Sequence, residues 1–446
     1  MARPITPGSL VALACVALAG GLRAAVLEVP ANHPNLRWEG RVSVEDSGAV
    51  DASWPTTRLV VRFRGTTASV WIDSGRNWWN VTLDGKASPP LPAGQGGWKV
   101  VASGLQDGPH DLVLSKRTES MVGRARVRAV RLEGASPELL AASPENAFGI
   151  EFIGNSITCG YGVLAADPLE GFRDSSQDAD ATASAIAART LGAQYRAVCR
   201  TGYGVIRDGS GGPNTVPGIY DRIHPETPAT WDHSRWHPDL VVVNLGTNDF
   251  AKGVPDSVAF QRGYANFLRH LVEVHPGTAI ALLHGPMIVD GFPFDSAGKP
   301  IPGATKLRGH IRQLLLTLRP ELDVPMDSIE LTPQTPELGY GGDYHPNRAQ
   351  SALNGGQIAA GIRRAFPGLL ASVGSRRPGA SPEAAGGAWS GEGPWLVELL
   401  DLQGRPIARL RGEGPGTLED LALPRGLSLA RIRQDGRSTV VRLARP

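Results

Sequence analysis

Hydrophobic and polar residues follow two different rhythms along the chain. Between residues 26 and 139, short runs alternate apolar with polar positions, as in RLVVRF (58–63), ASVWI (68–72) and DLVLS (111–115), and Gly, Pro, Asp and Asn separate the runs. A period of two is typical of strands with one buried face, and regularly spaced turn signals favour a β-sandwich of the jelly-roll class. We therefore predict an all-β jelly-roll domain over residues 26–139.

Beyond residue 146 the pattern changes to apolar strand runs that alternate with helical segments. The runs FGIEFI (148–153) and LVVVNL (240–245) contain few polar positions, and the amphipathic stretches 256–275 and 348–366 have helical spacing. Strands that alternate with helices predict right-handed βαβ units, in which helices cover both faces of a parallel sheet. We expect a three-layer α/β domain over residues 146–370, with any active site at the carboxyl edge of its sheet.

Three further segments flank these two domains. Arg3, the apolar run LVALACVALA (10–19) and the small residues at its end have the layout of a secretory signal peptide, here residues 1–25. Residues 371–393 have the composition of a flexible linker, and residues 394–446 alternate again as in a small β-sandwich. The sequence thus predicts a secreted, multi-domain protein that is extracellular or attached to the cell surface.

Charge and composition narrow the classes of partner. The formal net charge is +2, with no sustained stripe of Lys and Arg, so no nucleic acid partner is expected. No apolar run approaches the roughly 20 residues that a membrane span needs. His233 and His237 have the spacing of zinc ligands on a helix, but no acidic pattern lies nearby and Pro238 follows. We expect no metal and no other cofactor.

Two turns after expected strands carry a candidate nucleophile and a candidate anion-binding backbone. Ser156, in Gly-Asn-Ser, follows the strand at 148–153, so it would lie at the carboxyl edge of the sheet; the competing interpretation is a serine that caps the next helix. TGYG (201–204) follows a strand at 194–199, and glycine lets a backbone N–H approach a developing oxyanion.

Two later turns would complete a catalytic set. Asn248, in GTND after the strand at 240–245, has an amide that can donate to the same oxyanion, although asparagine after a strand is most often a turn former. His345, in GGDYHPN before the last helix, can serve as general base, and Asp343 is close enough in sequence to orient it.

Other residue types leave alternatives open. Tyr344, Trp231 and Trp236 can stack on a sugar ring beside a cleft, or they can belong to the core or its rim. Cys159 and Cys199 can form a disulfide in an exported protein, or they can be two small buried thiols.

These motifs resemble a known group of enzymes. GNS, TGYG, GTND and DYHP resemble the SGNH (GDSL-type) hydrolase superfamily, and SITCGYG, NLGTNDF and DYHPN more narrowly resemble the family 2 carbohydrate esterases. That family joins an N-terminal jelly roll to an SGNH catalytic domain, and VRFRGT and LSKRTE look similar to its N-terminal features. The resemblance covers about residues 36–370.

The resemblance implies a role for each candidate residue. Ser156 would be the nucleophile, and its own N–H, the N–H of Gly202 and the side chain of Asn248 would form the oxyanion hole. His345 would be the base, oriented either by Asp343 or by a backbone carbonyl. Asn155 stands where the wider superfamily has Asp, a position that supports the turn and is not itself catalytic.

The family's activity is metal-free removal of O-acetyl groups from plant polysaccharides such as xylan and glucomannan, so the implied partner is an acetylated polysaccharide or oligosaccharide. Two alternatives remain: a carbohydrate-binding protein with residual hydrolysis, and an SGNH esterase that acts on a non-sugar ester. Residues 394–446 resemble the C-terminal sorting domains of secreted enzymes from gliding and fibre-degrading bacteria, which would engage an export machinery. A structural appendage or a sugar-binding module is the competing interpretation.

Overall fold

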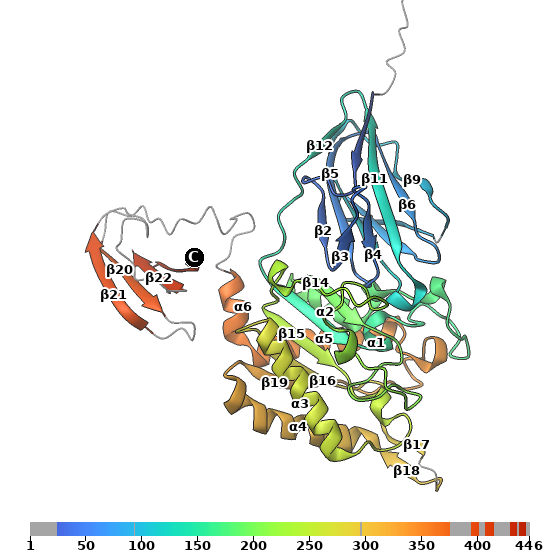
Figure 1. Ribbon diagram of the computed structural model, residues 1–446, viewed down its shortest axis with the longest axis vertical. Helices are drawn as coiled ribbons and strands as arrows, with labels where there is room; N and C mark the ends of the chain where they lie inside the picture. Colours follow the sequence, from blue (N-terminus) through green and yellow to red (C-terminus); the bar gives the residue numbers. More distant parts are fainter. Residues whose placement is uncertain are drawn as a thin grey trace, which may run out of the picture.

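The computed structural model describes residues 25–92, 94–294 and 297–374, together with four strands beyond residue 393. The predicted signal peptide, except for its last residue, lies outside the described residues, and so does the predicted linker beyond Gly374. The described chain forms an all-β domain followed by an α/β domain (Figure 1).

The N-terminal domain is a sandwich of two six-stranded antiparallel sheets, which confirms the predicted fold class. One sheet has the order β3-β4-β11-β6-β9, with β1 also paired to β11, and the other has the order β12-β5-β10-β7-β8, with β2 paired to β5. The strands are β1 (Ala25–Pro30), β2 (Arg37–Glu39), β3 (Val42–Val44), β4 (Val50–Ala52), β5 (Arg58–Gly65), β6 (Thr67–Asp73), β7 (Trp79–Leu83), β8 (Lys86–Leu91), β9 (Gly97–Ala102), β10 (Gly108–Lys116), β11 (Ala125–Gly134) and β12 (Glu138–Leu140).

Alternation along these strands builds the core of the sandwich. Phe63 from β5, Val70 from β6 and Leu112 from β10 are fully buried, while the residues on either side of each one along its strand are more exposed. Trp79 of β7 is also fully buried and belongs to this core.

The second domain contains a five-stranded parallel sheet in the order β14-β13-β15-β16-β19. The strands expected at 148–153, 194–199 and 240–245 and the helices expected at 256–275 and 348–366 are all present, with ends within one residue of the predicted ones. The strands are β13 (Gly149–Gly154), β14 (Gln194–Cys199), β15 (Leu240–Asn244), β16 (Ala279–His284) and β19 (Met326–Glu330); the helices are α1 (Ser156–Cys159), α2 (Ala183–Leu191), α3 (Ser257–Val274), α4 (Gly303–Leu322), α5 (Arg348–Ala365) and α6 (Pro367–Gly374).

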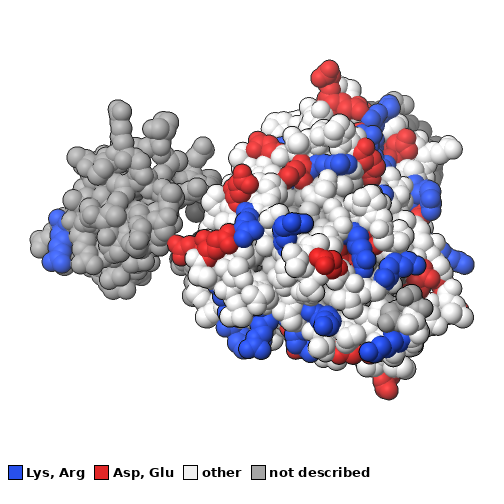
Figure 2. All heavy atoms as spheres, turned by 60° about the horizontal axis from the view of Figure 1, so that its bottom comes forward, with Lys and Arg blue, Asp and Glu red and all other residues white. Residues whose placement is uncertain are grey.

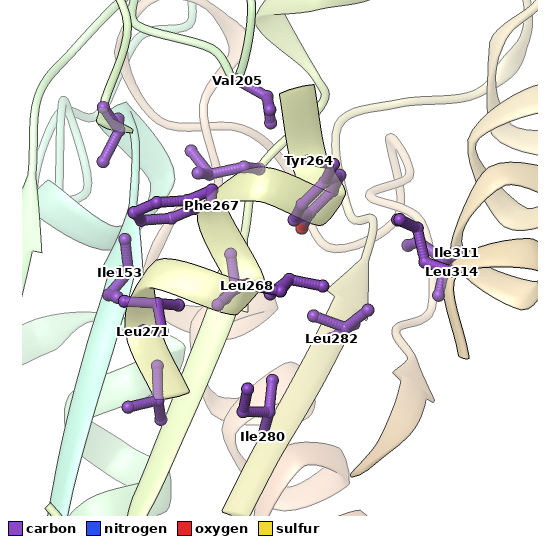
Figure 3. Packing of buried hydrophobic residues seen from close by; sticks show 14 of the residues in the cluster. Ile153, Val205, Tyr264, Phe267, Leu268, Leu271, Ile280, Leu282, Ile311 and Leu314 are labelled. Atoms are coloured by element: carbon purple, nitrogen blue, oxygen red, sulfur yellow. The ribbon is translucent and has the colours of Figure 1, made fainter. Parts of the chain in front are cut away.

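Helices cover both faces of the parallel sheet, as the apolar strand runs predict. On one face, Phe267, Leu268 and Leu271 of α3 pack on strand residues such as Ile153 and Ile280, with Leu314 of α4 beside them (Figure 3). On the other face, a second cluster joins Phe152 of β13 to α2 and α5.

Short elements connect these layers. A hairpin of β17 (Asp290–Phe294) and β18 (Pro300–Pro302) precedes α4, and the sequence did not predict it. Seven single 3₁₀ turns also occur in the described residues: η1 (Ser120–Val122), η2 (Asp174–Ser176), η3 (Ala179–Ala181), η4 (Pro217–Ile219), η5 (His233–Arg235), η6 (Asn248–Phe250) and η7 (Gly342–Tyr344).

Beyond residue 393, the described strands form one antiparallel sheet in the order β21-β20-β22-β23. A second layer of the predicted small sandwich is not found among the described residues. The strands are β20 (Pro394–Leu400), β21 (Pro406–Glu413), β22 (Leu429–Gln434) and β23 (Arg437–Arg442).

The molecular surface carries both signs of charge. On the face shown in Figure 2, acidic and basic side chains are interspersed. None of the helices in the described part of the chain combines the length and the apolar character that crossing a membrane requires.

Candidate active site

Three adjacent strand ends bring the first candidate residues to one edge of the sheet. In the parallel register, Gly154 of β13 is opposite Cys199 of β14 on one side and Asn244 of β15 on the other. Ser156, Gly202 and Asn248 therefore follow three neighbouring strands that end at the same level. This is the carboxyl edge, where open α/β sheets place their ligands.

Ser156 is the first residue of the short helix α1, and it does not cap that helix. Asn155 is the capping residue, because its side-chain oxygen accepts the N–H of Ile157 at 3.1 Å. A Cβ atom at Gly154 would lie 2.1 Å from Oγ1 of Thr158, so the sharp turn from strand to helix needs glycine there. Asn155 thus supports the turn that holds the Ser156 hydroxyl at the edge of the sheet.

Ser156 and His345 are hydrogen-bonded to each other. Oγ of Ser156 lies 2.8 Å from Nε2 of His345. Nδ1 of His345 lies 3.1 Å from each of two backbone oxygens, those of Gly342 and Asp343. A carbonyl only accepts, so Nδ1 carries the proton and Nε2 is left to accept the Ser156 hydroxyl. Burial lowers the pKa of His345, against the opposing effect of the two carbonyls, so the neutral imidazole is favoured.

Of the two groups expected to orient His345, the structure favours a backbone carbonyl over the Asp343 carboxylate. That carboxylate accepts the hydroxyl of Tyr161, and the backbone oxygen of Asp343 contacts the imidazole instead. Asp343 and Tyr344 have φ values of 48° and 55°, and this left-handed turn presents main-chain carbonyls to Nδ1. Tyr161 also stacks on the His345 ring, with centroids 4.3 Å apart. Sequence spacing alone carried no signal for the contribution of Tyr161.

We expect Asp343→Asn to lower kcat by less than about tenfold. The amide oxygen can still accept the Tyr161 hydroxyl, and the two carbonyls that hold His345 are unchanged, so only one charge-assisted hydrogen bond worth about 1.5–3 kcal/mol is weakened. Tyr161→Phe, which removes the same bond from the other side, should cost a similar factor. Initial rates of p-nitrophenyl acetate hydrolysis measure both. A loss near the roughly 10⁴-fold seen when a triad acid is replaced would instead mean that the carboxylate sets the tautomer.

The turn after β14 presents an unpaired backbone donor. Gly202 has φ of +80°, and within the described ranges no acceptor is paired with its N–H. Its carbonyl accepts the N–H of Gly209 at 2.8 Å, so the peptide that follows is held in place. Asn248 donates one amide proton to the carbonyl of Tyr203 at 2.8 Å, which leaves its second proton available. These two groups are suited to donate to an oxyanion.

Asp249 fixes the distance between these two turns, although the sequence motifs did not single it out as a site residue. Its buried carboxylate accepts the N–H groups of Val205 and Ile206 at 2.9 and 2.8 Å. Burial raises the pKa of Asp249, and the backbone donors oppose that effect. An acidic residue in the GTND turn that follows a buried strand was the available signal.

A disulfide joins the nucleophile turn to the strand before Gly202. The sulfurs of Cys159, at the end of α1, and Cys199, at the end of β14, are bonded, and the two Cα atoms are 5.7 Å apart. The alternative of two free thiols does not hold in the structure. The bond ties the elements that carry Ser156 and Gly202 directly to each other.

The three candidate aromatic residues have different surroundings. Tyr344 is 51% exposed beside His345, and its ring centroid is 5.5 Å from that of Tyr340. Trp236 donates its indole N–H to Gln194, the first residue of β14, so it lies toward the opposite end of the sheet. Trp231 and Trp236 line one cavity between the domains.

Of the two alternatives left open for Trp231 and Trp236, a rim position fits their surroundings better than stacking on a sugar. The guanidinium of Arg235 lies over the ring of Trp231 at 4.9 Å, and that of Arg196 lies over the ring of Trp236 at 4.0 Å. A ring face that carries a guanidinium is not open to a sugar. Both residues belong to the domain interface.

His233 and His237 lie in a cluster of histidines away from the sheet edge. His233 Nε2 is 2.9 Å from the carboxylate of Asp221, which also contacts His270. Across the parts of the chain that the structure describes, no three His, Cys, Asp or Glu side chains are grouped as metal ligands.

The fold and this edge of the sheet define the class of protein. A serine bonded to a histidine, with free amide donors on the two neighbouring strand ends, is the arrangement of a serine hydrolase of the GDSL type. The model of the GDSL-like lipase/acylhydrolase family matches residues 152–353, and the model of the carbohydrate esterase 2 N-terminal domain matches residues 38–142. The chain belongs to the family 2 carbohydrate esterases.

Similar proteins are consistent with this assignment. The cellulase/esterase CelE of Acetivibrio thermocellus is 31% identical over 337 residues, which are 74% of this chain but 40% of CelE. An acetylxylan esterase/glucomannan deacetylase of Cellvibrio japonicus is 28% identical over 58% of this chain and 74% of its own length. The structure of a family two carbohydrate esterase from Clostridium thermocellum in complex with cellohexaose is 29% identical, with a TM-score of 0.69, and the match covers 75% of this chain and 99% of that one.

Proposed function

We propose that this protein is a secreted esterase that removes O-acetyl groups from plant cell-wall polysaccharides such as xylan and glucomannan. The observation that carries the proposal is the 2.8 Å hydrogen bond between Oγ of Ser156 and Nε2 of a histidine whose other nitrogen is held by backbone. The names of the similar proteins, an acetylxylan esterase/glucomannan deacetylase among them, support a sugar ester as substrate.

The proposed reaction has two acyl-transfer steps. Ser156 Oγ attacks the acetyl carbonyl while His345 Nε2 takes its proton, and the resulting imidazolium then protonates the departing sugar hydroxyl. Water next attacks the acetylated serine, again giving a proton to His345, and acetate leaves as Ser156 takes that proton back. In both steps the negative carbonyl oxygen would accept hydrogen bonds from the N–H of Ser156, the N–H of Gly202 and the amide of Asn248.

His345 works as a dyad base in this proposal. The carbonyls of Gly342 and Asp343 hold its Nδ1–H and stabilise the imidazolium that forms, which is the role a carboxylate fills in a triad. Asp343 would act through its backbone oxygen, and its side chain would hold Tyr161.

The pH dependence of kcat/KM tests this dyad. A protonated His345 cannot accept the serine proton, so the rate should rise as pH rises through the pKa of His345 and then level off. Because burial lowers that pKa and no carboxylate among the described residues is hydrogen-bonded to the ring, we expect a midpoint below the ordinary value of about 6.5. Rates on p-nitrophenyl acetate between acidic and neutral pH measure it. A midpoint above the ordinary value would indicate that an anionic partner orients the imidazole.

Substrate recognition beside the dyad would involve Tyr344. Its exposed ring is adjacent to His345 in sequence and packs edge-on against Tyr340, so the pair offers an aromatic surface on which a sugar can stack. Trp231 and Trp236 have no part in this proposal.

Export from the cell is the second part of the proposal. The disulfide between Cys159 and Cys199 supports an oxidising compartment, where such bonds persist. The signal peptide and the sorting function of residues 394–446 remain predictions from the sequence.

Acetate release from acetylated xylan and acetylated glucomannan tests the proposal, with hydrolysis of long-chain acyl esters and polysaccharide binding measured in parallel. We expect acetate release from at least one polymer and little activity on the long-chain esters. Polymer binding without acetate release would favour the carbohydrate-binding alternative. Activity confined to the long-chain esters would favour a non-sugar substrate.

A further inference from the structure

The N-terminal domain reaches the candidate oxyanion hole through one buried carboxylate. Glu119 lies in the loop between β10 and η1 and is fully buried. Its Oε2 accepts the backbone N–H of Thr201 at 2.8 Å, and its Oε1 accepts the Thr201 hydroxyl. Thr201 directly precedes Gly202, so a residue of the first domain holds the peptide next to the candidate oxyanion donor.

The carboxylate is itself held by the second domain. Gln177 donates its amide N–H to Oε1 of Glu119 at 2.7 Å, and its amide oxygen accepts the backbone N–H of Glu119 at 2.9 Å. Together with the two groups of Thr201, three donors satisfy this buried charge. Burial raises the pKa of Glu119, and these hydrogen bonds oppose that effect.

Further contacts fix the backbone of the same loop. Lys116, at the end of β10, is fully buried and donates its ammonium to the carbonyls of Thr118 and Glu119 at 2.7 and 3.4 Å. Ser120 accepts a hydrogen bond from Arg200, the residue before Thr201, at 3.0 Å. The loop and the turn after β14 therefore form one connected hydrogen-bonded unit across the domain boundary.

Gly202 needs such support because glycine does not set its own conformation. With φ at +80°, the direction of its N–H depends on the peptide groups on either side. The N–H of Gly209 donates to the carbonyl of Gly202, and Glu119 accepts two hydrogen bonds from Thr201, the residue before Gly202. An oxyanion hole is effective when its donors are oriented before the reaction begins.

We propose that Glu119 is a positioning residue for the oxyanion hole, so that the N-terminal domain contributes directly to the rate of ester hydrolysis. The inference rests on the proposed function, since it assumes that the Gly202 N–H binds the oxyanion. It assigns the jelly-roll domain a part in catalysis that is independent of any binding of sugar.

Glu119→Gln tests the inference, with Glu151→Gln as the matched control. In the glutamine, an NH₂ group replaces one of the two oxygens that accept hydrogen bonds from Thr201. That contact then joins two donors, so the turn at Thr201 and Gly202 should shift although the side chain keeps its volume. Losing one oxyanion donor costs about 100- to 1000-fold, and because a displaced donor is weakened rather than lost, we expect kcat to fall about 10- to 100-fold. KM should stay unchanged. The affinity for a boronic acid that forms a tetrahedral adduct with the serine should fall by the same factor as kcat.

Glu151 provides a control of the same chemical type. It is a buried glutamate on β13 whose carboxylate pairs with Arg41 of the N-terminal domain at 3.1 Å, and within the described residues no hydrogen bond or ion pair joins that carboxylate to the turn at Gly202. Glu151→Gln should lower thermal stability and leave kcat per folded molecule unchanged. Thr201→Val, which removes only the hydroxyl contact to Glu119, should lower kcat by a smaller factor and serves if Glu119→Gln does not fold.

Hydrolysis of p-nitrophenyl acetate distinguishes failure of the inference about Glu119 from failure of the proposed function. The reaction needs the serine and the oxyanion hole but no polysaccharide. If the parent protein is active and folded Glu119→Gln or Thr201→Val keeps the parent kcat, the inference is overturned and the proposed function stands. An equal loss of kcat in Glu151→Gln also overturns it, since general loosening would then explain the effect. A parent protein that hydrolyses no ester overturns both.

Discussion

Ser156→Ala is expected to lower kcat for ester hydrolysis by at least about 10⁴-fold, while polysaccharide binding and thermal stability stay close to those of the parent protein. The hydroxyl is the group that the imidazole of His345 contacts, and no second nucleophile is bonded to that ring within the described residues. In the Ser156→Ala variant, water would have to attack the acetyl carbonyl in place of the serine, and only the oxyanion donors would assist it. Initial rates on acetylated xylan, together with a melting curve, measure the effect.

Ser184→Ala is a suitable control for this substitution. Ser184, the second residue of α2, is 6% exposed, as Ser156 is, but none of the hydrogen bonds described for the site involves it. Its replacement should leave the rate unchanged. If Ser156→Ala retained more than about one hundredth of the parent rate, well above the residual activity that oxyanion binding alone supports, the assignment of the nucleophile would fall.

Asn248→Ala should lower kcat about 100- to 1000-fold with little change in KM. The amide proton that is not bonded to Tyr203 is free to donate to the oxyanion, which exists only in the transition state, so its loss affects the chemical step more than substrate binding. Steady-state kinetics on p-nitrophenyl acetate and on an acetylated oligosaccharide separate kcat from KM.

Asn35→Ala makes the same chemical change elsewhere in the protein. Asn35 also donates its side-chain amide to a backbone carbonyl, that of Leu139 at 3.2 Å, but it lies in the N-terminal sandwich. It should alter stability slightly and kcat not at all. A variant at Asn248 that raised KM and kept kcat would show that this amide binds the substrate and does not stabilise the oxyanion.

Much of the fold could be predicted from the sequence because its two domains use different periodicities. Alternation along stretches such as 58–63 can build a sandwich, and continuous runs such as 240–245 need burial on both faces. Parallel strands end at the same edge, so residues in the turns after them lie along that edge. The order of strands and turns was therefore enough to predict Ser156, Gly202 and Asn248 on one side of the sheet.

The side chains that support the site could not be predicted in the same way. The direction of the Asp343 carboxylate depends on the left-handed backbone conformation of Asp343 and Tyr344, which their residue types do not predict. Glu119 and Thr201 are 82 positions apart, and only the docking of two domains brings them together. Trp231 and Trp236 are residue types that often stack on sugars, but the guanidinium groups of Arg235 and Arg196 lie over their rings.

The role of Ser156 as nucleophile is best tested by acetate release from acetylated xylan, measured while an organophosphonate progressively labels the protein and peptide mapping locates the label. The proposed mechanism predicts that activity falls in proportion to the fraction of molecules labelled at Ser156 and reaches background when that residue is fully modified. Acetate release that survives complete labelling of Ser156, or inactivation with the label on another residue, would contradict it.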